Sequence, residues 1–352
     1  MPISIVIGGQ YGSEGKGKVT HYFAKKYKAA AVIRVGGPNS GHTVINDKGE
    51  ALIFKHLPTS CIVGGIKSVL PSGHYINLEI LEHEIEVSGI NDSDLIIDPY
   101  AVIISKDDID KEANSGLIEK IGSTGCGLGS AISKRINRNA KTIFAKDIGG
   151  LKKYVSDSNL YLRNLLNQNE RVIIEGTQGF GLSLLHSNLY PYSTSRDTTA
   201  AGFLSESGLS PMDVDDVIMV IRAFPIRVAG NSGPLKNETT WEDISARSGS
   251  EVLFNEFTSV SKKLRRVANF DEEIVKRAIQ YNKPTKIVLN HVDYIDIHSQ
   301  CSRTLNAKVK SFLSEVEIKI KMSIDYIGNS REDILEKMVF EKGIEKFLQV
   351  AN

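Results

Sequence analysis

The sequence predicts an α/β protein with one large domain, residues 1–352, around a mostly parallel twisted sheet with a P-loop-like, glycine-rich phosphate loop. Three observations support this prediction. Short apolar runs typical of buried strands recur along the chain, helical stretches separate them, and several runs end in glycine-rich or polar loops. No internal repeat, low-complexity tract or clean linker divides the chain. Ligands bind beyond the carboxyl ends of the strands in such sheets, so these loops are expected to share one site.

The first elements follow one another in the order of a doubly wound sheet. Ile3–Ile7 is apolar and β-branched and predicts a buried strand. The run Gly8–Lys18 is too rich in glycine for regular structure, and Val19–Lys26 predicts a helix. Ala29–Val35 predicts a second strand, and the polar glycine loop Gly36–Thr43 follows it.

Later apolar runs predict further strands, each followed by residues suited to chemistry. The three runs that follow these strands are Gly176-Thr177-Gln178-Gly179, Arg222-Ala223-Phe224-Pro225 and Asn290-His291-Val292-Asp293. These strands are Arg171–Glu175, Val217–Ile221 and Thr285–Leu289, with a late strand at Val316–Met322. Helices are predicted at Asp107–Leu117, Asp147–Asn169 and Ser330–Phe347.

Composition excludes several classes of protein. A content of 41% hydrophobic and 24% charged residues is that of a globular chain and argues against disorder. The formal net charge of +1 gives no general electrostatic reason to expect nucleic acid or an anionic membrane as a partner. Cys61, Cys126 and Cys301 lack metal-ligand spacing and are expected to be reduced thiols. With no room for a signal peptide and no apolar run long enough to span a bilayer, we expect a cytoplasmic protein.

The first glycine loop predicts a phosphate site. Gly12-x-x-x-x-Gly17-Lys18 fits the start of a phosphate-binding loop, in which backbone N–H groups, a helix N-terminus and a lysine hold phosphate oxygens. Val19 fills the slot where such loops carry a Ser or Thr for Mg²⁺. A tight turn with solvated lysines is the alternative, but five glycines between Gly8 and Gly17 would cost much backbone entropy for a turn alone.

Five segments in order resemble the adenylosuccinate synthetase family. Gly9-Gln10-Tyr11-Gly12-Ser13-Glu14-Gly15-Lys16-Gly17-Lys18 is similar to the family signature Gly-x-Gln-Trp-Gly-Asp-Glu-Gly-Lys-Gly-Lys. Asn39-Ser40-Gly41-His42-Thr43 resembles Asn-Ala-Gly-His-Thr. The remaining matches are Gly122-Ser123-Thr124-Gly125-Cys126-Gly127-Leu128-Gly129, Glu175-Gly176-Thr177-Gln178-Gly179 and Tyr190-Pro191-Tyr192-Ser193-Thr194-Ser195. The resemblance implies the fold of that family, in a chain shorter than its typical bacterial members.

The resemblance also implies a reaction and its residues. The γ-phosphoryl group of a nucleoside triphosphate goes to O6 of a 6-oxopurine nucleotide, and the amine of L-aspartate then displaces that phosphate. Ser13, Lys16 and His42 match catalytic positions, with His42 as a general acid, and Ser13 and Gly41 match the positions that hold Mg²⁺. The triphosphate would be bound by Gly12, Ser13, Glu14, Gly15, Lys16, Gly17, Lys18, Gly41, His42, Thr43, Asn290, Asp293 and Gly328. The purine nucleotide would be bound by Ser13, Asn39, Ser123, Thr124, Arg138, Gln178 and Thr194.

Two further implications concern the partner subunit and aspartate. Arg138 matches an arginine that reaches the nucleotide phosphate of the neighbouring subunit, which implies a homodimer with shared sites; a solvated basic helix face is the alternative. Ser259–Arg266 aligns with the aspartate-binding loop, usually Thr-Thr-Gly-Arg-x-Arg, although its charges could also form a solvated surface. The aspartate ligands would be Val260, Ser261, Lys263 and Arg265.

Two departures from the family pattern suggest a changed substrate. Ser13 stands where the family has an aspartate that takes the purine N1 proton and ligates Mg²⁺. A smaller, uncharged residue leaves room for the 2-amino group of guanine, as in the viral branch of the family that joins aspartate to dGMP on the route to diaminopurine DNA. His291 replaces a lysine beside the donor base, while Asp293 is kept, so the expected donor is ATP or dATP.

The leading hypothesis is therefore a phage ligase that makes N6-succino-2-amino-2′-deoxyadenylate in the host cytoplasm. Three alternatives stay open at this point. A conventional adenylosuccinate synthetase would use IMP and GTP. A catalytically idle nucleotide-binding regulator would explain the missing aspartate. A GTPase-like switch is disfavoured by Val19 and would leave the aspartate-binding loop without a purpose.

Overall fold

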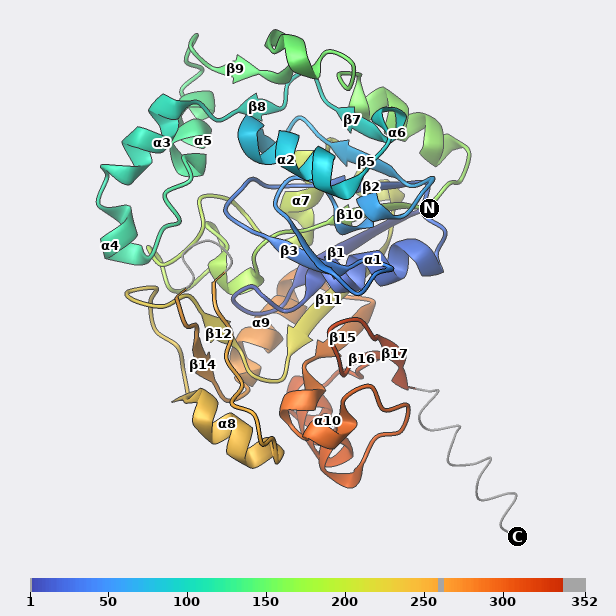
Figure 1. Cartoon of the computed structure of the whole chain (residues 1–352), viewed down its shortest axis with the longest axis vertical. Coiled ribbons are helices and arrows are strands. Elements are labelled where there is room, and N and C mark those ends of the chain that lie inside the picture. Colours follow the sequence, from blue (N-terminus) through green and yellow to red (C-terminus); the bar gives the residue numbers. More distant parts are fainter. Residues whose placement is uncertain (1, 259–262, 338–352) are drawn as a thin grey trace.

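A nine-stranded sheet organises the part of the chain that this computed structural model describes, residues 2–258 and 263–337. The sheet runs through the molecule with helices on both sides (Figure 1). All its pairings are parallel except the last, between β16 and β17, which confirms the predicted fold class. Its strands in spatial order are β17 (Leu335–Glu336), β16 (Tyr326–Gly328), β15 (Lys286–Asn290), β11 (Val214–Arg222), β1 (Ile3–Gly8), β10 (Val172–Glu175), β2 (Ala31–Arg34), β5 (Lys67–Leu70) and β7 (Leu95–Ile97).

The two faces of the sheet pack against different helices. Successive side chains of a strand point to opposite faces, so Ile3, Ile5 and Ile7 of β1 join one hydrophobic cluster and Val6 joins another. Phe23 of α1 (Lys16–Lys26) is fully buried in the cluster of Val6. Helices that contribute side chains to the opposite cluster are α6 (Ser158–Asn167), α7 (Ala200–Ser207), α8 (Trp241–Ser248), α9 (Glu272–Asn282) and α10 (Ala307–Ile320).

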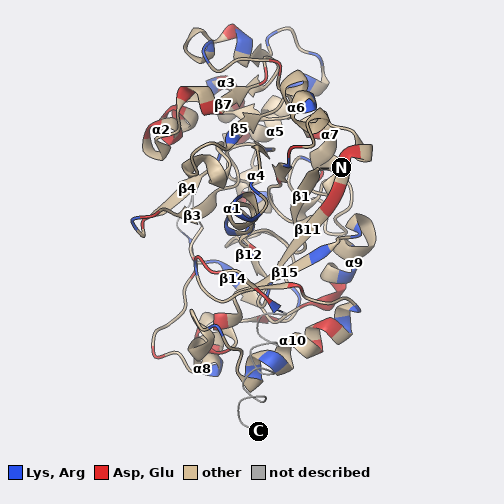
Figure 2. Ribbon diagram, turned by 90° about the vertical axis from the view of Figure 1, so that its right-hand side faces the viewer, with Lys and Arg blue, Asp and Glu red and all other residues tan. Residues whose placement is uncertain are grey.

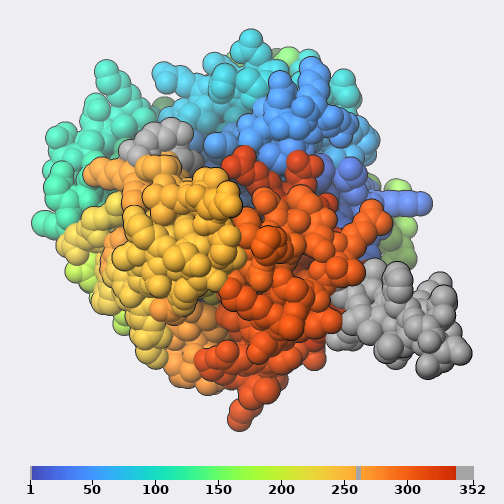
Figure 3. All heavy atoms as spheres, turned by 60° about the horizontal axis from the view of Figure 1, so that its bottom comes forward, coloured from blue at the N-terminus to red at the C-terminus, as the bar shows by residue number. Residues whose placement is uncertain are grey.

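Smaller units lie around the central sheet and carry the walls of the site. Figure 1 places α3, α4 and α5 at one end and α8 with β12 and β14 at the other. In Figure 3 the red C-terminal segment lies beside the yellow and orange segments and reaches the blue N-terminal part. These peripheral elements are α2 (Leu78–Ser88), α3 (Lys106–Ala113), α4 (Leu117–Ile121), α5 (Leu128–Ile136), α8 (Trp241–Ser248), β3 (His42–Ile45), β4 (Ala51–Phe54), β6 (Tyr75–Ile76), β8 (Val102–Ile103), β9 (Ile143–Phe144), β12 (Ile226–Arg227), β13 (Glu238–Thr239) and β14 (Arg266–Ala268).

The structure confirms the five predicted strands that belong to the central sheet, and it corrects the late one. Val316–Met322 is not a strand, because its first five residues lie in α10. Val316 and Ile320 are buried four residues apart, which is helical spacing, whereas Ile318 between them is 77% exposed.

Three predicted helices have different limits. The Asp107–Leu117 helix ends at Ala113, and α4 starts after Gly116, whose φ of 72° breaks the helix. Of Asp147–Asn169 only α6 is α-helical, because the Asp157 side chain accepts a hydrogen bond from Leu160 N and caps the helix start there. Within Ser330–Phe347, residues 335–336 pair with β16 as strand β17, and residues 338–347 lie outside the described part of the chain.

Charged residues of both signs occur along the molecule in Figure 2, in keeping with the net charge of +1. Single helices differ in sign, because α2 carries glutamates and no lysine or arginine, whereas α1 carries lysines and no acidic residue. Within residues 2–258 and 263–337, no helix combines the length and the hydropathy that crossing a bilayer requires.

Candidate active site

A cleft of about 1700 Å³ collects the loops that follow the central strands β1, β2, β10 and β15. Parallel strands end at the same edge of a sheet, which is why loops far apart in the sequence meet there. Glu14, Arg138, Asn290 and Gly328 are not on its walls. The predicted site residues that line it are Gly12, Ser13, Gly15, Lys16, Gly17, Lys18, Asn39, Gly41, His42, Thr43, Ser123, Thr124, Gln178, Thr194, Lys263, Arg265 and Asp293.

The phosphate loop is built for an anion. Gly12 and Gly15 have φ of 92° and 90°, a backbone region that glycine enters without strain. Helix α1 starts directly afterwards, and Gly15 at its N-cap position offers no side chain to its first N–H groups. These N–H groups and the positive end of the helix dipole suit phosphate oxygens.

A buried carboxylate holds this loop in shape. Glu14 is fully buried, and its Oε1 accepts hydrogen bonds from the backbone N–H of Gln10 at 3.1 Å and of Gly12 at 2.8 Å. Its Oε2 lies 2.6 Å from Lys16 Nζ. The side chain of Glu14 therefore supports the loop from behind, and only its backbone N–H remains for the predicted contact with a triphosphate.

The turn after β10 fits against the phosphate loop without room for side chains. A Cβ added to Gly8 would lie 2.5 Å from Glu14 Oε2 and 2.7 Å from the Gln178 carbonyl oxygen. A Cβ added to Gly179 would lie 2.5 Å from Gly12 N. This close packing places Gln178, a predicted purine ligand, directly beside Gly8 and Gly12 of the phosphate loop.

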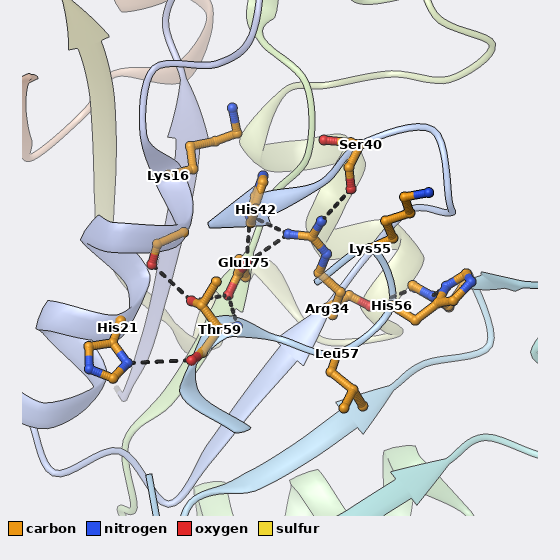
Figure 4. A network of polar contacts seen from close by, with 12 residues as sticks. Lys16, His21, Arg34, Ser40, His42, Lys55, His56, Leu57, Thr59 and Glu175 are labelled. Carbon is orange, nitrogen blue, oxygen red and sulfur yellow. Dashed lines mark hydrogen bonds and ion pairs between the residues drawn. The ribbon is translucent and has the colours of Figure 1, made fainter. Parts of the chain in front are cut away.

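A buried charge cluster orients His42 (Figure 4). The fully buried Glu175 places Oε1 at 2.7 Å from Arg34 Nη1 and 2.5 Å from His42 Nδ1. Its Oε2 accepts hydrogen bonds from the N–H and the hydroxyl of Thr59, both at 3.0 Å. Arg34 also donates to the Ser40 carbonyl at 2.9 Å, which fixes the loop that carries Gly41.

The cluster sets the protonation state of His42. Burial and the nearby Arg34 guanidinium lower the pKa of His42 to about 3 in the protein without ligands. The neutral ring directs Nδ1 toward the Glu175 carboxylate, so the proton of this tautomer belongs on Nδ1. Nε2 is buried and has no hydrogen-bond partner within the described residues. His42 lines the cleft and retains one nitrogen for a ligand.

The purine-binding positions meet across three segments. Asn39 Nδ2 donates to Thr194 Oγ1 at 3.3 Å, and Gln178 Nε2 donates to the Asn39 carbonyl at 3.4 Å. On the opposite wall, Ser123 donates to Glu112 Oε1 at 2.7 Å, a carboxylate that the sequence did not suggest. These contacts bring Asn39, Gln178 and Thr194 together, and their binding of a purine stays a prediction.

The positions assigned to the donor base lie against the phosphate loop. Asn290 Nδ2 donates to the Glu14 carbonyl at 2.7 Å, and Lys18 Nζ donates to the Ser330 carbonyl at 2.8 Å. A Cβ on Gly328 would lie 1.9 Å from Asn290 Oδ1, so this position requires glycine. Burial lowers the pKa of Lys18 to about 8 and raises the pKa of Asp293.

The aspartate-binding positions are only partly described. Lys263 and Arg265 line the cleft, whereas the predicted ligands Val260 and Ser261 lie outside the described residues. Residues 256–258 and 263–265 run antiparallel: Arg265 N donates to the Glu256 carbonyl at 2.8 Å, and Thr258 N donates to the Lys263 carbonyl at 2.9 Å. Arg138 is exposed beyond the end of α5 and does not line the cleft, although its neighbours Asn137 and Asn139 do, so its role in a neighbouring subunit stays a prediction.

Sequence reasoning missed residues that hold the site together. Arg34, Glu175 and Arg222 were given no role, yet all three are fully buried. Each is a charged residue that ends an apolar strand, β2, β10 or β11. A charge in that position is costly unless it is paired, so it could have marked the site from the sequence.

The chain was compared with known proteins. A family model described as adenylosuccinate synthetase matches residues 5–145 and 143–304. Over 342 residues the sequence is 37% identical to an adenylosuccinate synthetase of Methanococcus vannielii, covering 94% of this chain and 97% of that one. The corresponding enzyme of Archaeoglobus fulgidus is 34% identical over 338 residues, covering 94% and 96%. The match covers nearly the whole length of these archaeal relatives, so their chains are about as short as this one.

Two solved structures are similar to the whole chain. One is the cyanophage S-2L succinoaminodeoxyadenylate synthetase (PurZ) bound to dGMP and dATP as an energy donor, with a TM-score of 0.79, 25% identity and coverage of 97% of this chain and 99% of that one. The other is the fully ligated adenylosuccinate synthetase from Plasmodium falciparum, with a TM-score of 0.84, 19% identity and coverage of 96% and 100%. The second likeness concerns the fold alone.

Proposed function

The chain belongs to the adenylosuccinate synthetase family of carbon–nitrogen ligases, and from this premise we propose that it joins L-aspartate to C6 of dGMP with ATP or dATP. The guanine O6 attacks the γ-phosphorus and the nucleoside diphosphate leaves, with loss of the N1 proton. The aspartate amine then attacks C6, loses a proton and displaces phosphate. The product is N6-succino-2-amino-2′-deoxyadenylate, a precursor of diaminopurine deoxynucleotides.

The observation that carries the proposal is Ser13. Its side chain is exposed on the cleft, and it follows Gly12, which packs against the predicted purine ligand Gln178. Its φ of 57° is a left-handed conformation that aspartate and asparagine adopt more readily than serine. Serine at this position is a small, uncharged group, which suits the 2-amino group of guanine. The likeness to the phage enzyme bound to dGMP and dATP supports the same substrate pair.

The phosphoryl transfer would depend on three groups of this chain. The N–H groups at the start of α1 would bind the triphosphate, and Lys16, held by Glu14, would add a fixed positive charge. His42 Nε2 would face the transferred group, because Glu175 occupies Nδ1. An anionic ligand raises the pKa of a nearby histidine, so the triphosphate would convert neutral His42 into a proton donor.

The site suits Mg²⁺ that arrives with the triphosphate. Ser13 and Gly41, both on the cleft wall, offer a hydroxyl and a carbonyl, the oxygen ligands that Mg²⁺ prefers. Residues 2–258 and 263–337 contain no group of three or more His, Cys, Asp or Glu side chains placed to hold a metal alone. Phosphate oxygens would therefore supply most of the coordination. Bound Mg²⁺ would neutralise phosphate charge and favour attack on the γ-phosphorus.

A conventional synthetase that uses IMP and GTP is the second candidate. The archaeal relatives of that name are 34–37% identical to this chain, a closer sequence match than the 25% of the phage enzyme. The two candidates differ in the acceptor and in the donor, so one experiment separates them.

That experiment measures phosphate release and product mass with purified protein, Mg²⁺ and aspartate. IMP, GMP and dGMP are each combined with ATP, dATP and GTP. We expect turnover of dGMP with ATP or dATP. The product should have the mass of deoxyadenylosuccinate with the hydrogen at C2 replaced by an amino group. Preferential turnover of IMP with GTP would establish the conventional reaction. Nucleotide binding without phosphate release would favour an idle regulatory protein.

Variants of Ser13 test the specificity argument separately. Ser13→Asp is expected to shift the ratio of kcat/KM for dGMP over IMP at least tenfold toward IMP, because a carboxylate fills the space proposed for the 2-amino group. Ser13→Asn is the matched control, with the same shape and no charge. A ratio that stays unchanged in Ser13→Asp would exclude Ser13 as the specificity residue.

A further inference from the structure

We propose that Glu256 positions Arg265 for the aspartate carboxylate and ties the aspartate-binding segment to the phosphate loop. This inference rests on the part of the proposed function in which aspartate is the amine substrate, and it is independent of the choice between dGMP and IMP. Glu256 lines the cleft and lies four residues before the start of the aspartate-binding positions. The amino-acid sequence alone suggested no role for Glu256.

The Glu256 carboxylate joins three parts of the site. Its Oε2 lies 3.1 Å from Arg222 Nη1 and 3.4 Å from Arg265 Nη1, and its Oε1 pairs with Arg222 Nη2. The Tyr294 hydroxyl donates to the same Oε1 at 3.1 Å. Tyr294 directly follows Asp293 of the donor-base loop.

Arg222 carries this connection to the phosphate loop. Its Nη1 donates to the Ser13 carbonyl at 2.9 Å, and its backbone exchanges two hydrogen bonds with the side chain of Gln10. The Arg222 side chain is fully buried, so its guanidinium cannot be moved without breaking these contacts. Glu256 is therefore attached to a fixed point, and Arg265 is attached to Glu256.

The charges of this cluster leave room for one more anion. Burial, the largest single effect, raises the pKa of Glu256, but the attraction and hydrogen bonds of its neighbours, Arg222 first among them, together lower the pKa to about 2, so Glu256 is ionised. Burial lowers the pKa of His291, which keeps that neighbour neutral. One carboxylate then faces the two guanidinium groups of Arg222 and Arg265. The remaining positive charge suits the carboxylate of a substrate.

The geometry at Arg265 shows which part of it stays available. Glu256 contacts only Nη1, at a long 3.4 Å, and the Arg265 carbonyl is held by Trp241 Nε1 at 2.8 Å. Arg265 Nε is buried and has no hydrogen-bond partner within the described residues. A carboxylate bound through two parallel hydrogen bonds would use the Nε side of the guanidinium, while Glu256 holds the other side. Glu256 is thus a positioning residue and does not compete with the substrate.

The test is a steady-state analysis of Glu256→Gln, which keeps the shape of the side chain and removes its charge. The assay uses whichever purine acceptor and triphosphate the parent enzyme turns over, so a failure of the dGMP proposal would not affect it. We expect KM for aspartate to rise at least tenfold, with kcat and both nucleotide KM values within threefold of the parent. This pattern is that of a residue acting on ground-state binding.

Two further variants distinguish positioning from general loosening. Glu206→Gln is the matched control, because Glu206 pairs with the buried Arg196 away from this cleft; it should leave KM for aspartate unchanged. Arg265→Lys should itself raise KM for aspartate, and adding Glu256→Gln to it should have little further effect if Glu256 acts through Arg265. An unchanged KM for aspartate, an equal rise in all three KM values, or additive effects in the double variant would each overturn the proposal. If Glu256→Gln does not fold, Glu256→Asp replaces it, with the same expected rise in KM for aspartate alone.

Discussion

Removal of the Glu175 charge is expected to destabilise the fold and impair the reaction together. The substitution Glu175→Gln keeps the volume of the side chain in a fully buried position. Glu175 accepts four hydrogen bonds, from Arg34, from His42 and twice from Thr59. A neutral amide has one acceptor oxygen, so its NH₂ group must face some of these donors, and the Arg34 guanidinium loses its buried counter-charge.

The magnitude follows from the burial of this pair. Breaking a buried ion pair by removing one partner costs about 3–5 kcal/mol. For a chain of 352 residues about 1 kcal/mol corresponds to roughly 1.4 °C, so Tm should fall by roughly 4–7 °C. Because Glu175 also orients His42, and a positioned acid contributes roughly 10²–10⁴-fold to a rate, kcat should fall by roughly 10–100-fold.

Calorimetry and steady-state kinetics at neutral pH provide the measurements. The matched control is Glu238→Gln, which removes a charge from the exposed pair of Glu238 with Arg266, 2.7 Å apart. Exposed pairs contribute about 1 kcal/mol or less, so its Tm should change by roughly 1.4 °C at most. If Glu175→Gln changed Tm no more than this control, the buried cluster would not have the energetic role described for it.

Three other predictions follow from buried or crowded positions. Gly328→Ala should raise KM for the triphosphate at least tenfold, because its Cβ would lie 1.9 Å from Asn290 Oδ1, whereas Gly149→Ala, with no neighbouring atom within 4 Å, should have no effect in the same assay. Asp293→Asn should raise KM for the triphosphate and leave KM for aspartate unchanged; the opposite pattern would remove Asp293 from the donor site. Burial lowers the pKa of His42 and of His56 to about 3, and burial together with His56 lowers the pKa of His74. Below about pH 6.5 these three histidines bind protons in the unfolded chain but not in the folded chain. The free energy of unfolding is therefore highest above that pH and decreases as the pH falls. The decrease is at most about 4 kcal/mol per pH unit for the three groups together. Urea unfolding at pH 7 and pH 5.5 would show this loss, and a His56→Gln variant should show a smaller one; equal midpoints at both pH values would contradict the assignment.

The sequence predicted the central sheet because its strands are buried on both faces. Such strands can be recognised as continuous apolar runs even when the neighbouring strands are unknown. Examples are Ile3–Ile7 and Val217–Ile221, and both lie in the central sheet. Their convergence could also be predicted, since parallel strands end at one edge. The α10 segment was misread because Val316, Ile318 and Ile320 alternate with polar residues, and only tertiary packing decides that Ile318 faces solvent.

The cluster around Glu256 could not be predicted in the same way. Arg222 contacts the carbonyl of Ser13, 209 positions away, and Glu256, 34 positions away. Nothing in the local sequence of Glu256 indicates either contact, because Asn255-Glu256-Phe257 has no periodicity that distinguishes a buried glutamate from an exposed one. The resemblance to a known family predicted the residues that contact ligands. The residues that support those ligand-binding residues could be identified only from the three-dimensional structure.

Two fully buried glutamates and one partly buried glutamate explain how the site can hold several cations, and orient His42, before any ligand binds. Glu14 holds Lys16, Glu175 holds Arg34 and His42, and Glu256 holds Arg222 and Arg265. Each of these carboxylates has a side chain no more than 17% exposed. A buried cation without a partner would be expelled or neutralised, so without these acids the cationic groups would not stay fixed at the cleft. Since a charge that is already in place needs no reorganisation when anionic substrates bind, the acids contribute to binding although none of their carboxylates is proposed to touch a substrate.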